Sequence, residues 1–584
     1  MGPAPGVHPS HSRVRSGTGK RLEVSLPVLQ QRRRSLHDSI SNNGMRVWPS
    51  SAVHGVHTWA VHPLRTCARF CQNLSAFKRQ RFSTRSKHPP IDLSLISSWF
   101  MLCAKQGPKA GVGLATVVIS FVFSTYYNVL MSWAIYYLFN SFRSTLPWQS
   151  CNDTWNVVQN CSSGFPGNVT HLQSASQQFF DNKLLEKTDG IEDSGGIRWE
   201  LLGCLVAAWV IVYFCIFKGV KSTGKVVYFT AVYPYFILFA LLINNVQLPG
   251  AINGILYFVT PVWSKLFQIK VWVNAAAQVF NSIGIGFGSM VSMSSYNKFN
   301  NNVLRDAFIV TMTNSFTSIL AGFVIFSAIG YMAHIHNLPV ENIATDGPGL
   351  VFVVYPEVIS TMPLFQLWAP LFFIMLLCLG LDSQFATVEV AITFLKDEFG
   401  TKILPFLKRE ELLTLVVCLL CFLLGLPHIT KGGIYVFQLM DHYTAVVSLM
   451  FLAFAEVVSV CWVFGTPRIS LMVKRMLGRS PNIYFRVCWL ILCPMLVLCI
   501  LVASIVQYTP VRYGKYKYPS WAEGVGWGVS LVSIIWIPLG AIHELYINKG
   551  SLHDRLKSAV TPTVDLDVDN SPDIQSHQQN RRVH

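Results

Sequence analysis

Polar side chains that could bind a cation interrupt the most apolar parts of this 584-residue chain. The sequence LLCLGLDSQFATVEV places Asp382 and Ser383 deep inside an apolar segment. An ionisable residue is costly in such a position and therefore indicates a function. A carboxylate, a hydroxyl and backbone carbonyls loosened near Gly380 are all hard oxygen ligands for a cation. We therefore predict a cation site here, with a hydrogen bond between two helices as the alternative.

A group of glycines marks a second candidate site. Gly284, Gly286 and Gly288 alternate in the sequence NSIGIGFGS, within another apolar segment. Each glycine weakens a helix interior by about 1 kcal/mol relative to alanine. Residues two apart do not line one face of a helix, which argues against a packing surface. Transporters bind ions and substrates at helices that are broken near the middle of the membrane, so we predict a break here.

Amide and hydroxyl side chains precede these glycines and recur in the next apolar segment. They are Gln278, Asn281, Ser282, Asn314, Thr317 and Ser318. A single such residue usually joins two helices by a hydrogen bond. Two clusters beside a broken helix fit an ion pathway better.

The composition indicates that these residues lie in a membrane. Only 13% of the residues are charged and 52% are hydrophobic, whereas soluble globular proteins have roughly 25% charged residues. The apolar residues form segments that are mostly long enough to cross about 30 Å of hydrocarbon. We predict an all-α polytopic membrane protein with about ten spans, at approximately 111–141, 201–217, 226–246, 271–294, 303–333, 367–395, 411–426, 433–464, 485–508 and 524–547.

The first 90 residues have a different composition. They contain 15 lysines and arginines but two acidic residues, which accounts for most of the net charge of +17. They are rich in Ser, His and Pro and have no apolar periodicity, so we interpret them as disordered. A mitochondrial presequence and a nucleic-acid-binding arm are alternatives that the rest of the chain does not support. We therefore expect no nucleic-acid partner.

The loops between the spans predict the orientation of the chain. Basic residues in three loops fall on one side of the membrane, and this side is cytosolic if the basic N-terminus is cytosolic. They are Lys218, Lys221, Lys225, Lys402, Lys408, Arg409, Lys474, Arg475 and Arg479. Arg512, Lys515 and Lys517 fall on the outer side, against this pattern. We expect a plasma-membrane protein with both termini in the cytosol.

The loop at 142–200 lies outside in this orientation. It contains three glycosylation sequons, at Asn152, Asn160 and Asn168. Its only cysteines are Cys151 and Cys161, and an oxidising exterior favours a disulfide between them.

Longer stretches of the sequence resemble a known family. The chain contains, in order, STYYNVLMSWAIYYLFNSF, FKGVKSTGKVVYFTA, VWVNAAAQVFNSIGIGFG, SSYNKFNNN, GPGLVFVVYPE, LGLDSQFATVE and GGIYVFQLMDHY. Their order and spacing over about residues 105–560 resemble the sodium- and chloride-dependent neurotransmitter and amino-acid symporters. The resemblance implies the leucine-transporter fold, with the ten segments corresponding to family spans 3–12. It implies no enzyme activity, and no catalytic constellation is evident in the sequence.

The resemblance also implies individual site residues. Substrate-binding positions are Tyr127, Asn281, Gly284, Gly286, Phe287 and Ser383. The first sodium would bind Ser282 and Asn314, and the second would bind Ser383, Asp382 and the carbonyl of Leu379. Chloride would bind Gln278, Ser282 and Ser318. Asp441 would belong to the outer gate and Asp397 to the inner gate, and the cysteine pair matches the family's extracellular disulfide.

These matches imply symport of a small amino acid or amino-acid-like neurotransmitter by alternating access, in the GABA, proline, glycine or taurine class. Sodium and chloride are transported together with the substrate, and no other cofactor is expected. A homo- or hetero-oligomer is left open.

The sequence departs from the family pattern in two places. Asn281 stands where the family usually has an aromatic residue over the substrate. No counterparts of family spans 1 and 2 are found, so we divide the chain into a non-family region at 1–104, a transporter domain at 105–560 and a disordered cytosolic tail at 561–584. Span 1 supplies half of both sodium sites in the family. The alternative is therefore a truncated or variant member that does not transport and associates with intact relatives.

Overall fold

The computed structural model describes residues 111–162, 173–335, 337–343, 348–407, 409–506, 508, 510–514 and 516–560. The N-terminal region at 1–104, with its first 90 residues expected to be disordered, and the tail at 561–584 lie outside the described residues. Helices dominate the described part, which also contains two short two-stranded sheets. In one sheet β1 and β2 are parallel, and in the other β3 and β4 are antiparallel.

The elements in chain order are α4 (Gly111–Ser141), η5 (Val158–Asn160), β1 (Cys161–Ser162), β2 (Gln173–Ser174), α5 (Ala175–Gln178), η6 (Phe179–Leu185), α6 (Trp199–Ile216), α7 (Val220–Val246), α8 (Ala251–Val259), η7 (Trp263–Phe267), α9 (Ile269–Ile283), α10 (Ser289–Ser294), α11 (Val303–Ile335), α12 (Val340–Ile343), η8 (Leu350–Val354), α13 (Tyr355–Thr361), α14 (Phe365–Leu407), α15 (Glu410–Gly425), η9 (Leu426–Ile429), α16 (Gly433–Asp441), η10 (His442–Ser448), α17 (Leu449–Val458), η11 (Ser459–Gly465), α18 (Thr466–Leu477), α19 (Ile483–Val487), η12 (Cys488–Leu492), α20 (Cys493–Val506), β3 (Arg512–Tyr513), β4 (Tyr516–Lys517), α21 (Ser520–Ile534), α22 (Trp536–Ile547) and α23 (Leu552–Val560).

Nine helical stretches of the described chain are long and apolar enough to cross a membrane. They are Gly111–Ser141, Trp199–Ile216, Thr223–Val246, Val303–Ile335, Phe365–Gly400, Glu410–Ile429, Gly433–Leu477, Ile483–Val506 and Ser520–Ile547. The remaining predicted segment, 271–294, is divided into α9 and α10, and each of these helices is too short to cross alone. The chain is therefore a multi-pass membrane protein.

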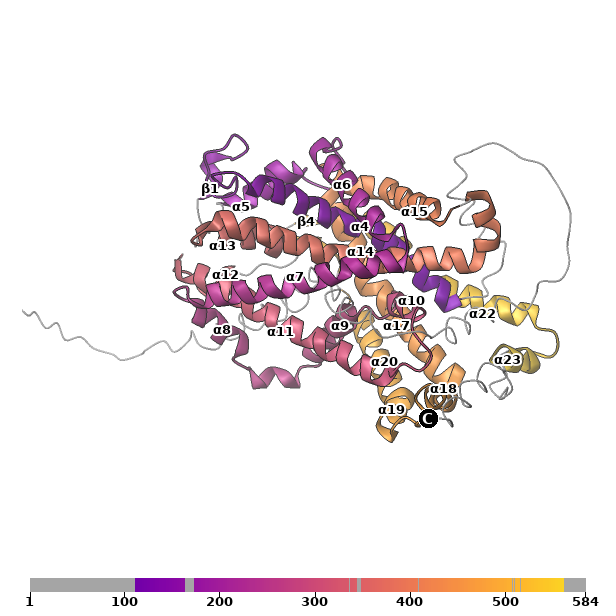
Figure 1. Ribbon diagram of the computed structural model, residues 1–584. Coiled ribbons are helices and arrows are strands. Elements are labelled where there is room, and N and C mark those ends of the chain that lie inside the picture. The colour runs from indigo at the N-terminus through magenta and orange to yellow at the C-terminus, as the bar shows by residue number, and fades with distance from the viewer. Residues whose placement is uncertain are drawn as a thin grey trace, which may run out of the picture.

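Helix α4 lies at the centre of the packing, beside α14 (Figure 1). Buried residues occur along most of its length and on all its sides, as expected for an apolar helix in the interior of a bundle. Near its outer end the ring of Tyr137 stacks on Phe373 of α14, with 5.0 Å between the centroids. The Tyr137 hydroxyl donates to the carbonyl of Phe352, which attaches η8 to the same core. Helix α4 is thus a fixed support for the residues that line the candidate site.

Helices α8 and α11 make a second close contact. A Cβ at Gly254 would lie 1.9 Å from the carbonyl oxygen of Phe326 and 2.8 Å from the Cα of Gly330. Small residues allow helix backbones in membranes to approach this closely. This contact fixes the outer half of α11, the helix that carries Asn314.

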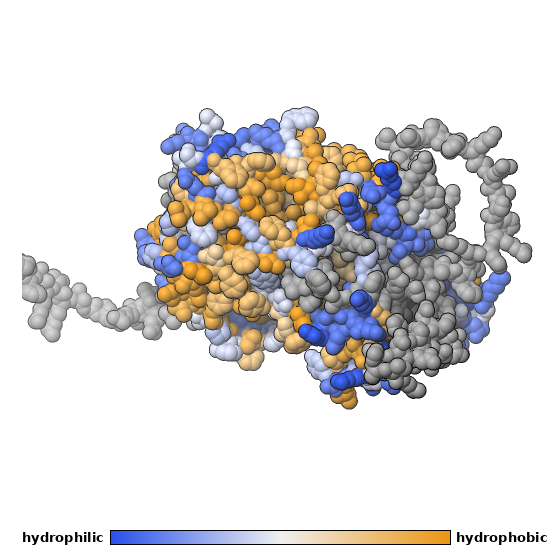
Figure 2. All heavy atoms as spheres, in the orientation of Figure 1, coloured by the Kyte–Doolittle hydropathy of each residue, from blue (hydrophilic) through white to orange (hydrophobic). Residues whose placement is uncertain are grey.

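Apolar side chains cover much of the visible surface. Figure 2 shows hydrophobic residues gathered over the helices in the left half of the view, with hydrophilic residues along the upper edge. Large apolar side chains such as Phe236, Phe308 and Leu490 are exposed. Exposed apolar surface on this scale marks contact with a partner or a membrane, and it agrees with the lipid environment predicted from composition.

Three loops meet at one end of the molecule. The backbone N–H of Ile191 donates to the hydroxyl of Tyr516, which joins the loop before α6 to the β3–β4 hairpin. The Tyr435 hydroxyl donates to the carbonyl of Thr188, which joins the same loop to the start of α16. The loop at 142–200, the turn between α15 and α16 and the hairpin therefore share one side of the membrane. Arg512 and Lys517 belong to this same end, where their charges can face water.

Candidate functional site

The helix break lies between α9 and α10. Gly284, Gly286 and Gly288 have φ angles of +77°, +90° and +70°, which side chains rarely allow. A Cβ at Gly286 would lie 3.0 Å from a methyl group of Leu449, and one at Gly288 would lie 3.0 Å from the Thr116 hydroxyl. The predicted break is therefore present, and both the backbone angles and the close packing require glycine.

Three aromatic rings meet at the break. Phe123 stacks on Tyr127 with 4.7 Å between centroids, and its edge meets Phe287 at 5.0 Å. The Ser120 hydroxyl donates to the carbonyl of Phe287 at 2.5 Å, which attaches the broken segment to α4. The predicted substrate residues Tyr127 and Phe287 thus lie on the same small cluster. The ring cluster therefore connects α4 to the segment that follows the end of α9.

The predicted cation residues lie on the buried face of α14. Leu379 and Asp382 are each 3% exposed. The Thr230 hydroxyl donates to one oxygen of Asp382 at 2.5 Å. Within the described part of the chain, the other oxygen has no hydrogen-bond partner. Ser383 lies close to the hydroxyl of Tyr127, so α14 and α4 contribute to one polar group.

The second polar pair joins α9 to α11. The hydroxyl of Ser282 donates to the amide oxygen of Asn314 at 3.0 Å. The same hydroxyl accepts from the amide nitrogen of Asn314 at 2.8 Å. These are the two residues that the resemblance assigns to the first sodium. Gln278 and Ser318 lie half-buried on the same two helices. The side chain of Asn281 lies outside the described residues, and Gly284 begins the break directly beyond it.

The two predicted gate residues lie at opposite ends of the helices. Asp441 ends α16, and its carboxylate accepts a hydrogen bond of 3.4 Å from Tyr126 on α4. Asp397 is exposed on α14, one turn beyond Thr393. The hydroxyl of Tyr296 lies 3.1 Å from that of Thr393 and donates to Glu389 at 3.0 Å. Asp441 therefore lies beside Tyr126, and Asp397 lies one turn from Thr393, which contacts Tyr296.

The outer loop contains the predicted covalent features. Cys151 and Cys161 form a disulfide with an S–S distance of 2.05 Å, as predicted. Asn152 and Asn160 are exposed, as glycan acceptors must be. Asn168 lies outside the described residues.

The structure adds site residues that the sequence did not identify. They are Ser120, Phe123, Tyr126, Thr230, Tyr296 and Glu389. Glu389 carries a detectable signal, because it is an ionisable residue in an apolar segment two turns beyond Asp382. Hydroxyl and aromatic residues are common in membrane helices, so the others carry no signal of their own.

One protein family and several known proteins are similar to this chain over most of its length. Residues 94–548 match the model of the sodium:neurotransmitter symporter family. The chain is 45% identical over 462 residues to the sodium- and chloride-dependent GABA transporter ine of Drosophila melanogaster, covering 78% of this chain and 49% of that protein. It is 42% identical over 508 residues to the sodium- and chloride-dependent glycine transporter 2 of Xenopus laevis, covering 80% and 63%. It is 43% identical over 460 residues to the sodium-dependent dopamine transporter of Bos taurus, covering 77% and 66%.

The chain spans about half to two thirds of the length of these relatives. The family match nevertheless covers most of the chain, and it includes α4, the broken helix and α14. Members of this family are transporters rather than enzymes and share the leucine-transporter fold. The chain therefore belongs to the sodium:neurotransmitter symporter family.

Proposed function

We propose that the chain is a sodium- and chloride-coupled symporter of a small amino acid or amino-acid-like neurotransmitter. The supporting observation is that Asp382 and Ser383 on α14, Tyr127 on α4 and the glycine break after α9 form connected parts of one region. A broken helix offers backbone carbonyls to cations and an N–H end to anions, which suits a zwitterion with its ions. The plasma membrane is the proposed location, with both termini in the cytosol.

Oxygen atoms are the proposed ligands of both sodium ions. The first ion binds at Ser282 and Asn314, whose side chains already meet. The second binds at Ser383, at Asp382 and at the backbone carbonyl of Leu379. An oxygen of Asp382 that lacks a hydrogen-bond partner in the described chain supports this assignment, because a buried charge is costly unless it is paired.

Amide and hydroxyl groups are the proposed chloride ligands, from Gln278, Ser282 and Ser318. The substrate occupies the space beside Tyr127, Phe287 and Ser383, next to the backbone of Gly284 and Gly286, and Asn281 is the remaining proposed contact. The polar group of Asn281 replaces an aromatic cover, which favours a small and polar substrate. We infer the GABA, glycine, proline or taurine class. The relatives themselves are named for GABA, glycine and dopamine.

Movement of sodium down its gradient supplies the energy for uptake. One positive charge that enters a cell at about −60 mV gains roughly 1.4 kcal/mol from the voltage alone. Alternation between the gate at Asp441 and the gate at Asp397 couples this energy to the substrate.

The second candidate is a family member that does not transport and associates with intact relatives. The same observation on Asp382 also fits this candidate, because a site that binds no ion would leave this oxygen without a partner among the described residues. Homo- or hetero-oligomers are consistent with either candidate.

Uptake by cells that express the full 584-residue chain distinguishes the two. Labelled glycine, proline, GABA and taurine are offered with sodium and chloride replaced in turn, and glycan maturation reports surface expression. Uptake that requires both ions, is lost in Asp382→Ala and persists in Asp554→Ala supports the symporter. Asp554 is the matched control because it is exposed on α23. Surface protein without uptake of any of these substrates supports the second candidate.

A further inference from the structure

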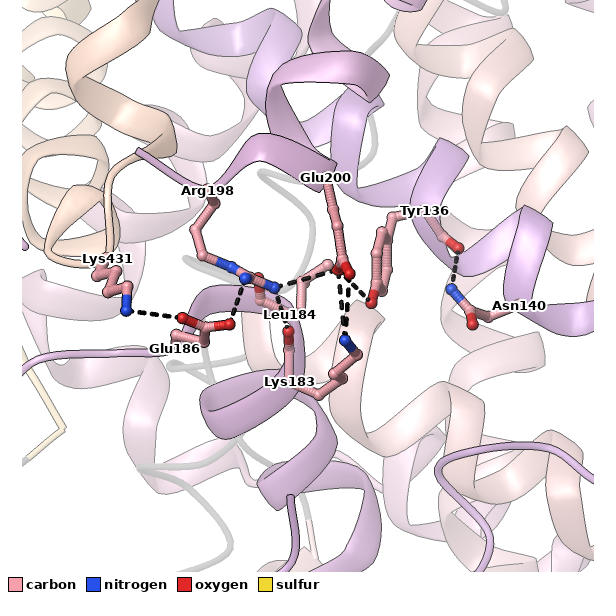
Figure 3. A network of polar contacts seen from close by, with 8 residues as sticks. All are labelled: Tyr136, Asn140, Lys183, Leu184, Glu186, Arg198, Glu200 and Lys431. Atoms are coloured by element: carbon pink, nitrogen blue, oxygen red, sulfur yellow. Dashed lines mark hydrogen bonds and ion pairs between the residues drawn. The ribbon is translucent and has the colours of Figure 1, made fainter. Parts of the chain in front are cut away.

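Arg198 connects the loop before α6 to the turn between α15 and α16 (Figure 3). Its side chain is buried, and its guanidinium pairs with Glu186 and, at 3.2 Å, with Glu200. It also donates to the carbonyl of Lys183 at 2.7 Å. The second oxygen of Glu186 pairs with Lys431 at 2.9 Å. Glu186 therefore bridges a buried arginine and a lysine from a distant part of the chain.

Backbone hydrogen bonds join the same two segments. They run from Arg198 N–H to the Ile429 carbonyl at 3.1 Å, from Lys431 to Gly196 at 3.2 Å and from Gly432 to Ser194 at 3.1 Å. A Cβ at Gly432 would lie 2.5 Å from the carbonyl oxygen of Asp193, so the two backbones are in close contact. We call residues 186–198 and 426–433 together the outer clasp.

Glu186 is held in an unusual conformation. Its φ angle is +48°, in the left-handed region that residues other than glycine rarely adopt. Burial alone would raise the pKa of Glu186, but Lys431 and Arg198 lower it below its usual value. The carboxylate is therefore ionised at neutral pH, and both cations remain attracted to it.

The outer clasp leads directly into the helix of the proposed outer gate. Helix α16 begins at Gly433, the last residue of the clasp, and ends at Asp441 beside Tyr126. The hydroxyl of Tyr435 donates to the Thr188 carbonyl at 2.8 Å, which holds the first turn of α16 against the clasp. Beyond Asp441 the chain continues as the π-helix η10, a less regular geometry that often occurs at functional sites.

We propose that Glu186, Arg198 and Lys431 position the outer gate by fixing the outer end of α16, so that Asp441 stays beside Tyr126. The inference rests on the proposed function only in treating Asp441 as a gate. Glu186 and Lys431 have side chains that are 34% and 40% exposed, so water and salt compete for their pairing. Breaking this pair loosens α16 and increases access to the space around Asp441.

Cysteine labelling tests this proposal in the full chain at the cell surface. Met440→Cys places a thiol beside Asp441, and a membrane-impermeant thiol reagent measures its accessibility, with the chain lacking this substitution as background. Glu186→Lys and Lys431→Glu are each combined with it, as is Lys431→Arg, which keeps the positive charge beside Glu186. Lys517→Glu is the matched control, since it reverses the same charge on an exposed residue of the same outer end.

Each single reversal is expected to increase the labelling rate about fivefold, the size of effect that loss of a partly exposed ion pair allows. Lys431→Arg keeps the rate within about twofold, because it retains a cation for Glu186, and the Lys517→Glu control leaves the rate unchanged. If a reversal prevents surface expression, Lys431→Gln replaces it in the test. This variant removes the charge without reversing it, so we expect a smaller increase in the labelling rate. Unchanged labelling in the variants that reach the surface overturns the proposal.

Uptake measured on the same cells separates this inference from the proposed function. Labelling that follows the charge pattern without uptake supports the clasp and contradicts the symporter. If uptake persists but the labelling rate does not change in the charge-reversed variants, the proposal about the outer clasp is overturned and the proposed function is not.

Discussion

Asp382 on α14 accepts a hydrogen bond of 2.5 Å from the hydroxyl of Thr230 on α7. This bond fixes one oxygen of a buried carboxylate and leaves the other without a hydrogen-bond partner in the part of the chain that the structure describes. An intramembrane charge in this state is costly, and a bound cation would offset the cost. The pair thus orients the residue that we assign to the second sodium.

Removal of the Thr230 hydroxyl is expected to weaken sodium binding. Thr230→Val keeps the shape of the side chain but leaves both oxygens of Asp382 unoriented. The sodium concentration for half-maximal binding or uptake should rise about tenfold, because hydrogen bonds to charged groups contribute roughly 1.5–3 kcal/mol. Thr230→Ser retains the donor and should behave like the original chain. Equal sodium dependence of the Val and Ser variants would show that the bond has no such role.

Gly286→Ala is expected to destabilise the protein. The backbone at Gly286 has a φ angle of +90°, and the added Cβ would lie 3.0 Å from Leu449. A strained backbone of this kind costs on the order of 1–3 kcal/mol. The melting temperature of the protein in detergent should therefore fall. Gly524→Ala is the control, because Gly524 lies in helix α21 with open space where the added Cβ would be. This substitution should not lower the melting temperature. Similar melting temperatures for the two variants would argue against the strain.

The stability of the outer region should depend on pH through Glu357. Burial raises the pKa of Glu357 to about 7, although a hydrogen bond from Ser174 opposes this shift. Glu357 lies on α13, outside the nine membrane-spanning stretches of the described chain. The folded state thus binds the proton more tightly than the unfolded chain, whose glutamate pKa is about 4.3. This contribution to stability is complete below about pH 4 and is lost as pH rises through 7.

The melting temperature measured from pH 5 to pH 8 tests this dependence. The decline with rising pH should be steeper in the original chain than in Glu357→Gln. Asp554→Asn is the control, since Asp554 is an exposed carboxylate on α23, away from the outer region. If the Glu357→Gln curve has the same slope as the original, the buried carboxyl does not titrate in this range.

Loss of the disulfide should impair the outer loop. Cys151→Ser or Cys161→Ser removes a covalent link across ten residues, and such links contribute about 2–4 kcal/mol. Glycan maturation should be delayed, because the loop carries the proposed glycans on Asn152 and Asn160. Cys499→Ser removes an exposed free thiol from α20 and should have no effect. Normal maturation of both loop variants would contradict a structural role for the bond.

Local signals in the sequence predicted the spans and the helix break. Hydropathy identifies segments that favour lipid, and glycines at Gly284, Gly286 and Gly288 mark positions where a helix is weakest. Hydropathy does not mark helix ends, however. Helix α14 continues to Leu407, although charged residues from Lys396 onward end its apolar stretch at about the predicted limit. Lys and Glu, which are frequent in this part of α14, favour a helix about as well as Leu does.

Partners of the candidate residues could not be predicted in the same way. Thr230, Tyr126 and Tyr296 are ordinary membrane-helix residues until the fold brings them to Asp382, Asp441 and Glu389. The contact of Ser282 with Asn314 was implied only by the family resemblance. The Glu186–Lys431 pair depends on two loops that meet only after the helices pack. Tertiary packing determines these contacts, and the local sequence does not encode it.

Binding of radioactive sodium to the purified full chain tests whether Asp382 belongs to a sodium site. We predict saturable binding that Asp382→Asn reduces by about tenfold or more in affinity and that Asp554→Asn leaves unchanged. Binding that is equally strong in Asp382→Asn, or no saturable binding by correctly folded protein, would contradict the assignment of this carboxylate to a sodium site.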